Sequence, residues 1–178
     1  MSAHFDVSKI SFFGLDDWSV AVCAWRGCCI EVFSRAEHSI ADCLRTLCSA
    51  GVPVGRNALN PFASNRLKAL RTTVLQNGFG GHGRAALKRM AEWERAYEIR
   101  AYLAHGEVTA TPHGISVTHI TFDGTTETRL PAKAFTRIEM LTMLADIEAS
   151  QKALHHQLGQ IKAFALKNKK PDPGSSPG

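Results

Sequence analysis

Apolar side chains fall into a regular pattern soon after the start of the chain. Over residues 18–47 they recur every three or four positions, which is the spacing of one face of an α-helix. Asp16 or Asp17 offers a side chain that caps the start of this helix, and Gly51 ends it. Residues 1–15 have no clean period and predict a short strand or an irregular lead-in.

Two more helices are predicted in the middle of the chain. Asn60–Pro61 starts the second, because proline at the first helical position has no amide that needs a partner. The third covers residues 84–105 and ends at Gly106 in a left-handed conformation. Between them, residues 78–83 match the G-x-G-x-x-G spacing of a dinucleotide cradle. A helix rather than a strand precedes this segment, so we predict a flexible interhelical loop.

The pattern changes to strict alternation over residues 107–130. Residues 115–122 form the clearest strand, and turn sequences stand on either side of it at 112–114 and 123–124. This arrangement predicts a small antiparallel β-meander.

A long helix is predicted after the meander. Thr136 and Glu139 have the spacing of a capping box, and the apolar pattern continues to Lys167, a length of ~48 Å at 1.5 Å per residue. Apolar residues repeat here every seven positions, which suits packing against a partner helix in the same chain or in a second protomer. One register of this seam consists of Met140, Ile147, Leu154 and Ile161, and the other of Leu144, Gln151, Leu158 and Ala165.

These elements predict a mainly α protein. We expect one helical domain over residues 1–167, a bundle with the β-meander at about 107–130 inserted before the long C-terminal helix. Residues 168–178 are rich in proline, glycine and serine and predict a disordered tail.

Charge and cysteine usage add limits on function. The net charge is +5, and residues 56–100 hold nine Lys or Arg against three Glu. A solvated basic face is the default interpretation of this segment, and a nucleic-acid surface is the alternative. No leader peptide and no apolar run of ~18 residues is evident, so we expect a cytoplasmic protein without a membrane partner. Five cysteines in the first predicted helix suit reduced thiols better than disulfides or a metal site.

The end of the third predicted helix carries the clearest chemistry. Arg100 precedes His105 by five residues, and the helix carbonyl end favours a cation at the histidine. A guanidinium holds a phosphate through two parallel hydrogen bonds, while an imidazole gives or takes the proton during attack by a ribose 2′-hydroxyl. Neither role requires a metal or a cofactor. The two side chains lie ~140° apart on an ideal helix, so they meet only if the helix changes its winding or a second protomer adds its copies.

The string from Arg100 to Gly106 resembles the Arg-x(4 to 6)-His motif, often ending His-Gly, of HEPN domains (higher eukaryotes and prokaryotes nucleotide-binding). The resemblance implies a helical bundle that forms a homodimer, with the two motifs meeting at the interface. It implies a metal-independent endoribonuclease of a toxin or antiphage system, with Arg100 and His105 catalytic, RNA or a nucleotide as ligand, and an antitoxin or other protein as partner. Active members usually have a polar residue after the motif Arg, where this chain has Ala101. The alternative is therefore a catalytically inactive HEPN-like module that binds a nucleotide, RNA or protein.

Four further residues are weaker candidates for the same site. Tyr102 is placed to stack on a base and Glu98 to orient Arg100, although a core tyrosine and a solvated glutamate are the commoner uses. Glu37 and His38 bring a second acid or base if their helix packs on the third. The other histidines share no spacing with carboxylates or cysteines, so no metal site is predicted. These are His113, His119, His155 and His156.

Overall fold

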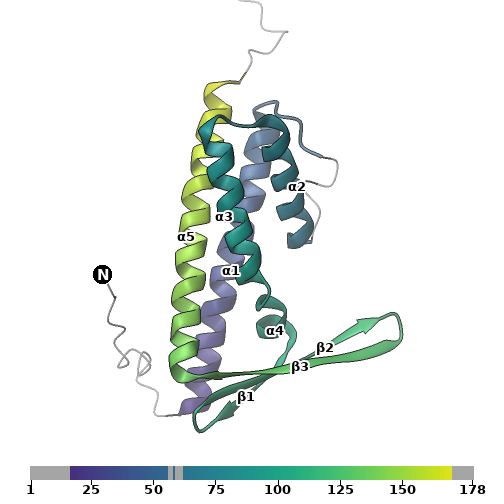
Figure 1. Ribbon diagram of the computed structural model, residues 1–178, viewed down its shortest axis with the longest axis vertical. Helices are drawn as coiled ribbons and strands as arrows, with labels where there is room; N and C mark the ends of the chain where they lie inside the picture. The colour runs from purple at the N-terminus through teal and green to yellow at the C-terminus, as the bar shows by residue number, and fades with distance from the viewer. Residues whose placement is uncertain (1–16, 56–57, 59–61, 170–178) are drawn as a thin grey trace, which may run out of the picture. The chain divides into compact units, whose positions relative to one another are not determined.

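A computed structural model describes residues 17–55, 58 and 62–169 of the chain (Figure 1). The order of elements is α1 (Trp18–Ser49), α2 (Ala63–Asn77), α3 (Gly81–Tyr97), α4 (Arg100–His105), β1 (Glu107–Thr111), β2 (Gly114–Asp123), β3 (Thr126–Thr136) and α5 (Arg137–Lys167). A mainly helical fold with one small antiparallel sheet is thus confirmed. In the described part of the chain, none of the helices has the length and apolar character needed to cross a membrane.

The chain forms two compact units. The first lies within residues 1–33 and 96–148 and holds the start of α1, the helix α4, the sheet and the start of α5. The second lies within residues 34–95 and 149–178 and holds the rest of α1, α2, nearly all of α3 and the rest of α5. Because α1 and α5 run through both units, neither unit is a continuous stretch of sequence.

Local end signals explain the bounds of the two long helices. The carboxylate of Asp17 accepts a hydrogen bond from the amide of Ser19 (2.8 Å) at the start of α1. At its end Gly51 has φ +79°, and the amides of residues 51 and 52 bond back to the carbonyls of residues 48 and 47. The predicted capping box at α5 is confirmed, because Glu139 accepts from the amide of Thr136 (2.7 Å) and the Thr136 hydroxyl accepts from the amide of Glu139 (3.2 Å).

In the first unit, the sheet is a meander of order β1–β2–β3. The turn between β2 and β3 uses Gly124 at φ +59°. The third strand continues to Thr136, six residues beyond the predicted end of the meander at 130. Pro131 lies where the pairing of β2 with β3 shifts, between the pairs Val117↔Lys133 and His119↔Leu130. A bulge on an edge strand tolerates a proline, so the strand continues through it.

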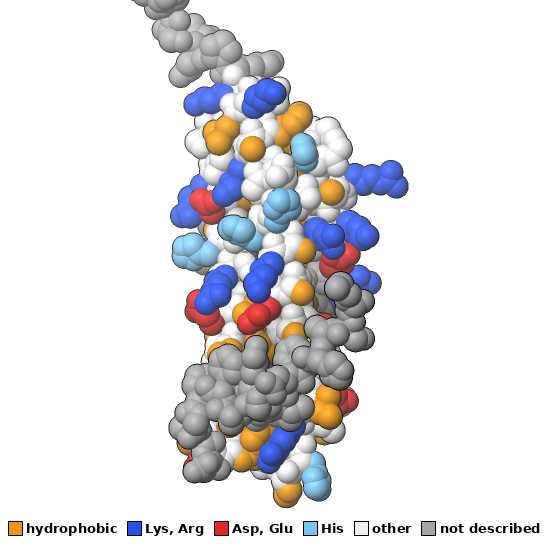
Figure 2. All heavy atoms as spheres, turned by 90° about the vertical axis from the view of Figure 1, so that its left-hand side faces the viewer, with side chains coloured by type: hydrophobic (Ala, Val, Ile, Leu, Met, Phe, Trp, Pro, Cys, Tyr) orange, Lys and Arg blue, Asp and Glu red, His pale blue; other side chains and the backbone are white. Residues whose placement is uncertain are grey.

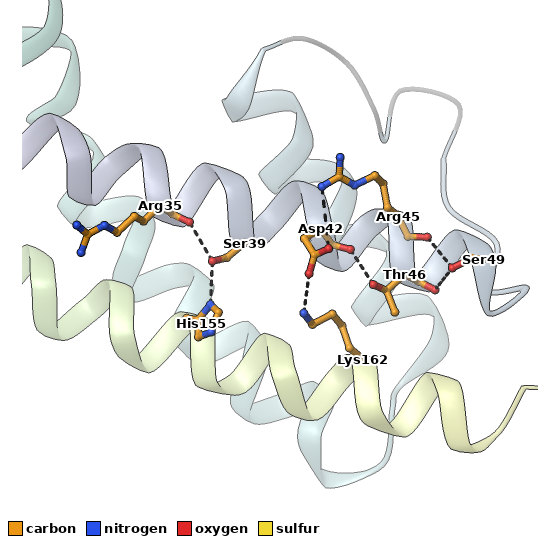
Figure 3. Close-up of polar contacts among 8 residues, drawn as sticks. All are labelled: Arg35, Ser39, Asp42, Arg45, Thr46, Ser49, His155 and Lys162. Atoms are coloured by element: carbon orange, nitrogen blue, oxygen red, sulfur yellow. Dashed lines mark hydrogen bonds and ion pairs between the residues drawn. The ribbon is translucent and has the colours of Figure 1, made fainter.

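The second unit has its own apolar core. Met90 and Trp93 of α3 and Leu70 of α2 are fully buried. Polar contacts join α1 and α5 at its edge, where the Ser39 hydroxyl lies 2.9 Å from Nδ1 of His155, and Nζ of Lys162 lies 2.6 Å from the carboxylate of Asp42 (Figure 3). The first register of the predicted seam of α5 is buried within the chain, as are Leu158 and Ala165 of the second, whereas Leu144 and Gln151 are partly exposed. Most of the seam therefore packs internally.

Two sequence predictions about residues 78–105 need correction. Residues 84–105 do not form one helix, because the turn at Glu98–Ile99 separates α3 from α4. The segment 78–83 is not a flexible loop, since α3 begins at Gly81. An added Cβ at Gly83 would overlap the carbonyl oxygen of residue 78, so the glycine permits a tight turn. The predictions for Asn60–Pro61, residues 1–15, Arg56 and residues 170–178 lie outside the described residues.

Five cysteine thiols of α1 are free. Cys23 and Cys48 are exposed, whereas burial raises the pKa of both Cys29 and Cys43 to about 12. These two thiols stay protonated in the folded chain up to a pH of about 12, whereas the thiols of the unfolded chain ionise near 9.0. A rise in pH from 9.0 to about 12 therefore lowers the stability of the fold.

We expect a maleimide at a pH of about 8 to label Cys23 and Cys48 rapidly, and Cys29 and Cys43 only after unfolding. Peptide mass spectrometry after timed quenching measures each rate. Equal rates for Cys29 and Cys23 would contradict the buried placement of Cys29.

Candidate functional site

The candidate site is built around α4, which has only six residues. A helix of this length is not stable by itself in water. Arg26 of α1 holds its last turn: the guanidinium donates hydrogen bonds to the carbonyl oxygens of Leu103 (2.5 Å), Ala104 (3.3 Å) and Gly106 (3.1 Å). Such donation satisfies carbonyls that have no partner within the helix. Arg26 therefore fixes the position of the motif histidine.

Gly106 ends α4 in a different way from that predicted. Its φ of −78° and ψ of 158° are extended rather than left-handed. An added Cβ would overlap the carbonyl oxygen of Tyr102 in α4 and that of Thr118 in β2. The end of the helix and the close contact with the sheet therefore both require glycine at this position.

His105 lies at the end of α4, and its side chain is exposed. Its ring stacks on that of His119 in β2, with the ring centroids 6.3 Å apart and an interplanar angle of 30°. His119 is only 8% exposed, and its Nδ1 has no hydrogen-bond partner among the described residues. It belongs to the face of β2 that also carries the buried side chains of Ile115 and Val117. The structure thus pairs the motif histidine with a second, buried imidazole.

Tyr102 fills the space beside this pair. Its ring lies 5.5 Å from that of His119, and Nζ of Lys133 in β3 lies 4.6 Å from the tyrosine ring centroid. The tyrosine is 9% exposed and its hydroxyl lies 3.5 Å from the carbonyl oxygen of Pro131. We call Tyr102, His105, His119 and Lys133 the α4 cluster. In this cluster the buried ring of Tyr102 contacts the imidazole of His119 and the ammonium group of Lys133, and the imidazole of His119 contacts that of His105.

Arg100, the first residue of α4, has a different aromatic neighbour. Its guanidinium carbon lies 5.3 Å from the ring centroid of Tyr97, and the side chain is half-buried. The structure therefore gives Arg100 and His105 separate ring contacts at the two ends of α4. Stacking through the face of a guanidinium leaves its N–H groups in its own plane, which is the plane used for a phosphate.

The other predicted residues lie as follows. Glu98 is exposed in the turn before α4. Glu37 and His38 belong to the second unit, whereas Arg100 and His105 belong to the first. There the carboxylate of Glu37 forms an ion pair with Arg66 (4.0 Å), and both side chains are only 18% exposed. His38 is exposed.

Sequence reasoning missed Arg26, His119 and Lys133 as parts of the site. The sequence around His119 has no spacing to carboxylates or cysteines that would indicate a site. The available signal was its place in β2, since it follows Ile115 and Val117 at alternate positions and therefore shares their buried face. A histidine on the buried face of a strand indicates a partner side chain on the element that covers that face.

Comparisons with protein-family models, with curated proteins and with solved structures found no match. Among the described residues there is no group of three or more His, Cys, Asp or Glu that is arranged to hold a metal ion. The assignment of function therefore depends on the geometry around α4.

Proposed function

We propose that this chain is an HEPN-like, metal-independent endoribonuclease whose reacting groups lie on α4. The observation that supports it best is the exposed His105 imidazole stacked on the buried His119. Positive charge in the same unit attracts a phosphodiester to this imidazole. Arg26 and Lys133 place cationic groups against residues of α4, and α4 itself begins with Arg100.

The proposed reaction is transesterification. His105 takes the proton of a ribose 2′-hydroxyl, the oxygen attacks phosphorus, and the bond from phosphorus to the 5′ oxygen breaks. The leaving oxygen takes a proton from a second imidazole, and the products carry a 2′,3′-cyclic phosphate and a 5′-hydroxyl. Arg100 binds the phosphate oxygens and stabilises their charge in the transition state.

The second imidazole comes from His105 of another protomer in a proposed homodimer. His119 is too buried to reach a substrate directly, so it acts as a positioning residue behind His105. The dimer uses a surface other than the seam of α5, because most of that seam is buried inside the chain.

Replacing His119 with phenylalanine is expected to lower kcat about tenfold, with KM little changed, because a ring remains behind His105 but the buried Nδ1 is lost. A purely structural role of His119 predicts a loss of stability with kcat of the folded protein unchanged.

The proposal is tested by incubating the purified full chain with single-stranded RNA and with tRNA in the presence of EDTA. Cleavage with 2′,3′-cyclic phosphate ends supports it. Growth arrest on expression of the active chain would place the activity in a toxin or antiphage setting. Intact RNA under all conditions, or products with other ends, would overturn it.

A second candidate is a catalytically inactive HEPN-like module. Ala101 favours it, because the position after the motif Arg has no polar group, and so does the stacking of Arg100 on Tyr97, a common structural use of arginine. Binding of RNA, a nucleotide or a protein without turnover would select this candidate.

A further inference from the structure

The outer face of α3 carries a stripe of basic side chains in the second unit. Arg84, Lys88 and Arg95 are all exposed, as is Ala91 between them. At 100° per residue these positions fall within about 60° of arc. The buried positions of the same helix, among them Met90 and Trp93, lie on the other side. We call Arg84, Lys88 and Arg95 the α3 stripe.

The α3 stripe differs from three arginines of its unit in having no carboxylate at ion-pair distance among the described residues. Arg71 contacts Glu94 (3.1 Å), Arg89 contacts Glu92 (2.7 Å), and Arg45 lies 4.0 Å from Asp42. Lys88 and Arg95 act on Glu92 only as more distant charges, since Arg89 is the main cause of the lowered pKa of that carboxyl. On the face drawn in Figure 2, some blue side chains lie beside red ones and others stand apart from them.

We propose that the α3 stripe binds the phosphate backbone of RNA, apart from the α4 cluster. The choice of RNA as the partner depends on the proposed function. Arg84 and Arg95 are eleven residues apart, or about 16 Å along the helix, so the stripe is long enough to contact several phosphates of one strand. The stripe has no aromatic side chain and no acidic one, which suits contacts to the backbone without sequence preference.

The test compares two triple variants of the full chain in a His105→Ala background. The stripe variant carries Arg84→Gln, Lys88→Gln and Arg95→Gln. The control carries Arg45→Gln, Arg71→Gln and Arg89→Gln, which removes the same charge from paired side chains of the same unit. The probe is a fluorescent single-stranded RNA with methylated 2′-hydroxyls, which cannot undergo transesterification, and binding is measured by anisotropy at several salt concentrations.

The stripe variant is expected to bind about tenfold more weakly than its parent, and the slope of log affinity against log salt should be smaller by about 2, because three phosphate contacts are lost. The control should keep the slope of its parent. Equal losses in both variants would show that only net charge matters and would overturn the proposal. So would equal binding of poly-glutamate with the same stripe dependence, which would indicate an acidic protein partner.

This binding experiment separates the two proposals because cleavage is measured in a different assay, on the chain with His105 intact. If that chain never cuts RNA but binding depends on the stripe, the endoribonuclease proposal is rejected and the α3 stripe proposal is retained. If that chain cuts RNA but the stripe variant binds normally, the α3 stripe proposal is rejected and the endoribonuclease proposal is retained.

Discussion

Replacing His105 with alanine is expected to lower the rate of RNA cleavage by about two to four orders of magnitude, the usual contribution of a general acid or base. The side chain is exposed at the end of α4, so its removal should leave folding intact. The rate is measured under single-turnover conditions, which isolate the chemical step from product release.

The matched control is His113→Ala. His113 is another exposed histidine of the first unit and lies in the turn between β1 and β2. His113→Ala removes the same atoms as His105→Ala, so the His113 variant should cleave RNA at the rate of the unsubstituted chain. If the His105 variant cleaves as fast as the His113 variant, the proposed proton transfer by His105 is wrong.

Replacing Arg26 with methionine is expected to destabilise the chain by about 3 kcal/mol and to abolish most of the cleavage activity. Its guanidinium donates to three carbonyl oxygens at the end of α4, and these lose a charged donor in the variant. Methionine keeps much of the apolar stem of the side chain, so the change reports mainly on the lost hydrogen bonds. Urea denaturation measures the stability, and hydrogen exchange of the α4 amides measures local opening.

Arg26→Lys provides the comparison. Lysine keeps the charge but lacks the planar fork that reaches several carbonyls, so we expect intermediate stability and activity. Fast exchange confined to α4, with the helices of the second unit still protected, would show that Arg26 acts locally. Unchanged exchange and unchanged activity in the methionine variant would contradict its role in holding α4.

Features with local causes were predicted well from the sequence. The bounds of α1 and α5 follow from Asp17, Gly51 and the pair of Thr136 and Glu139, each of which acts through hydrogen bonds or backbone geometry within a few residues. The alternation of the meander is equally local.

The break between α3 and α4 could not be predicted in this way. Glu98 and Ile99 are ordinary helix residues, with neither glycine nor proline to interrupt the pattern. What holds α4 as a separate helix comes from elsewhere in the chain, namely Arg26 in α1 and the strands β1 and β2, which contact α4. Long-range contacts overrule local propensity here.

Only part of the candidate site could be predicted from the sequence. The motif predicts Arg100 and His105 as candidates, whereas the stacking of His105 on His119 joins residues that only the fold of the meander brings together. Lys133 was hidden for a similar reason, because the bulge at Pro131 sets the register that pairs it with Val117.

The glycine after the motif histidine limits how this part of the chain can be engineered. An added Cβ at Gly106 would overlap the carbonyl oxygens of Tyr102 in α4 and of Thr118 in β2, so any larger side chain there must push α4 and the sheet apart. Because His105 and His119 belong to these two elements, their ring contact depends on the missing side chain at position 106.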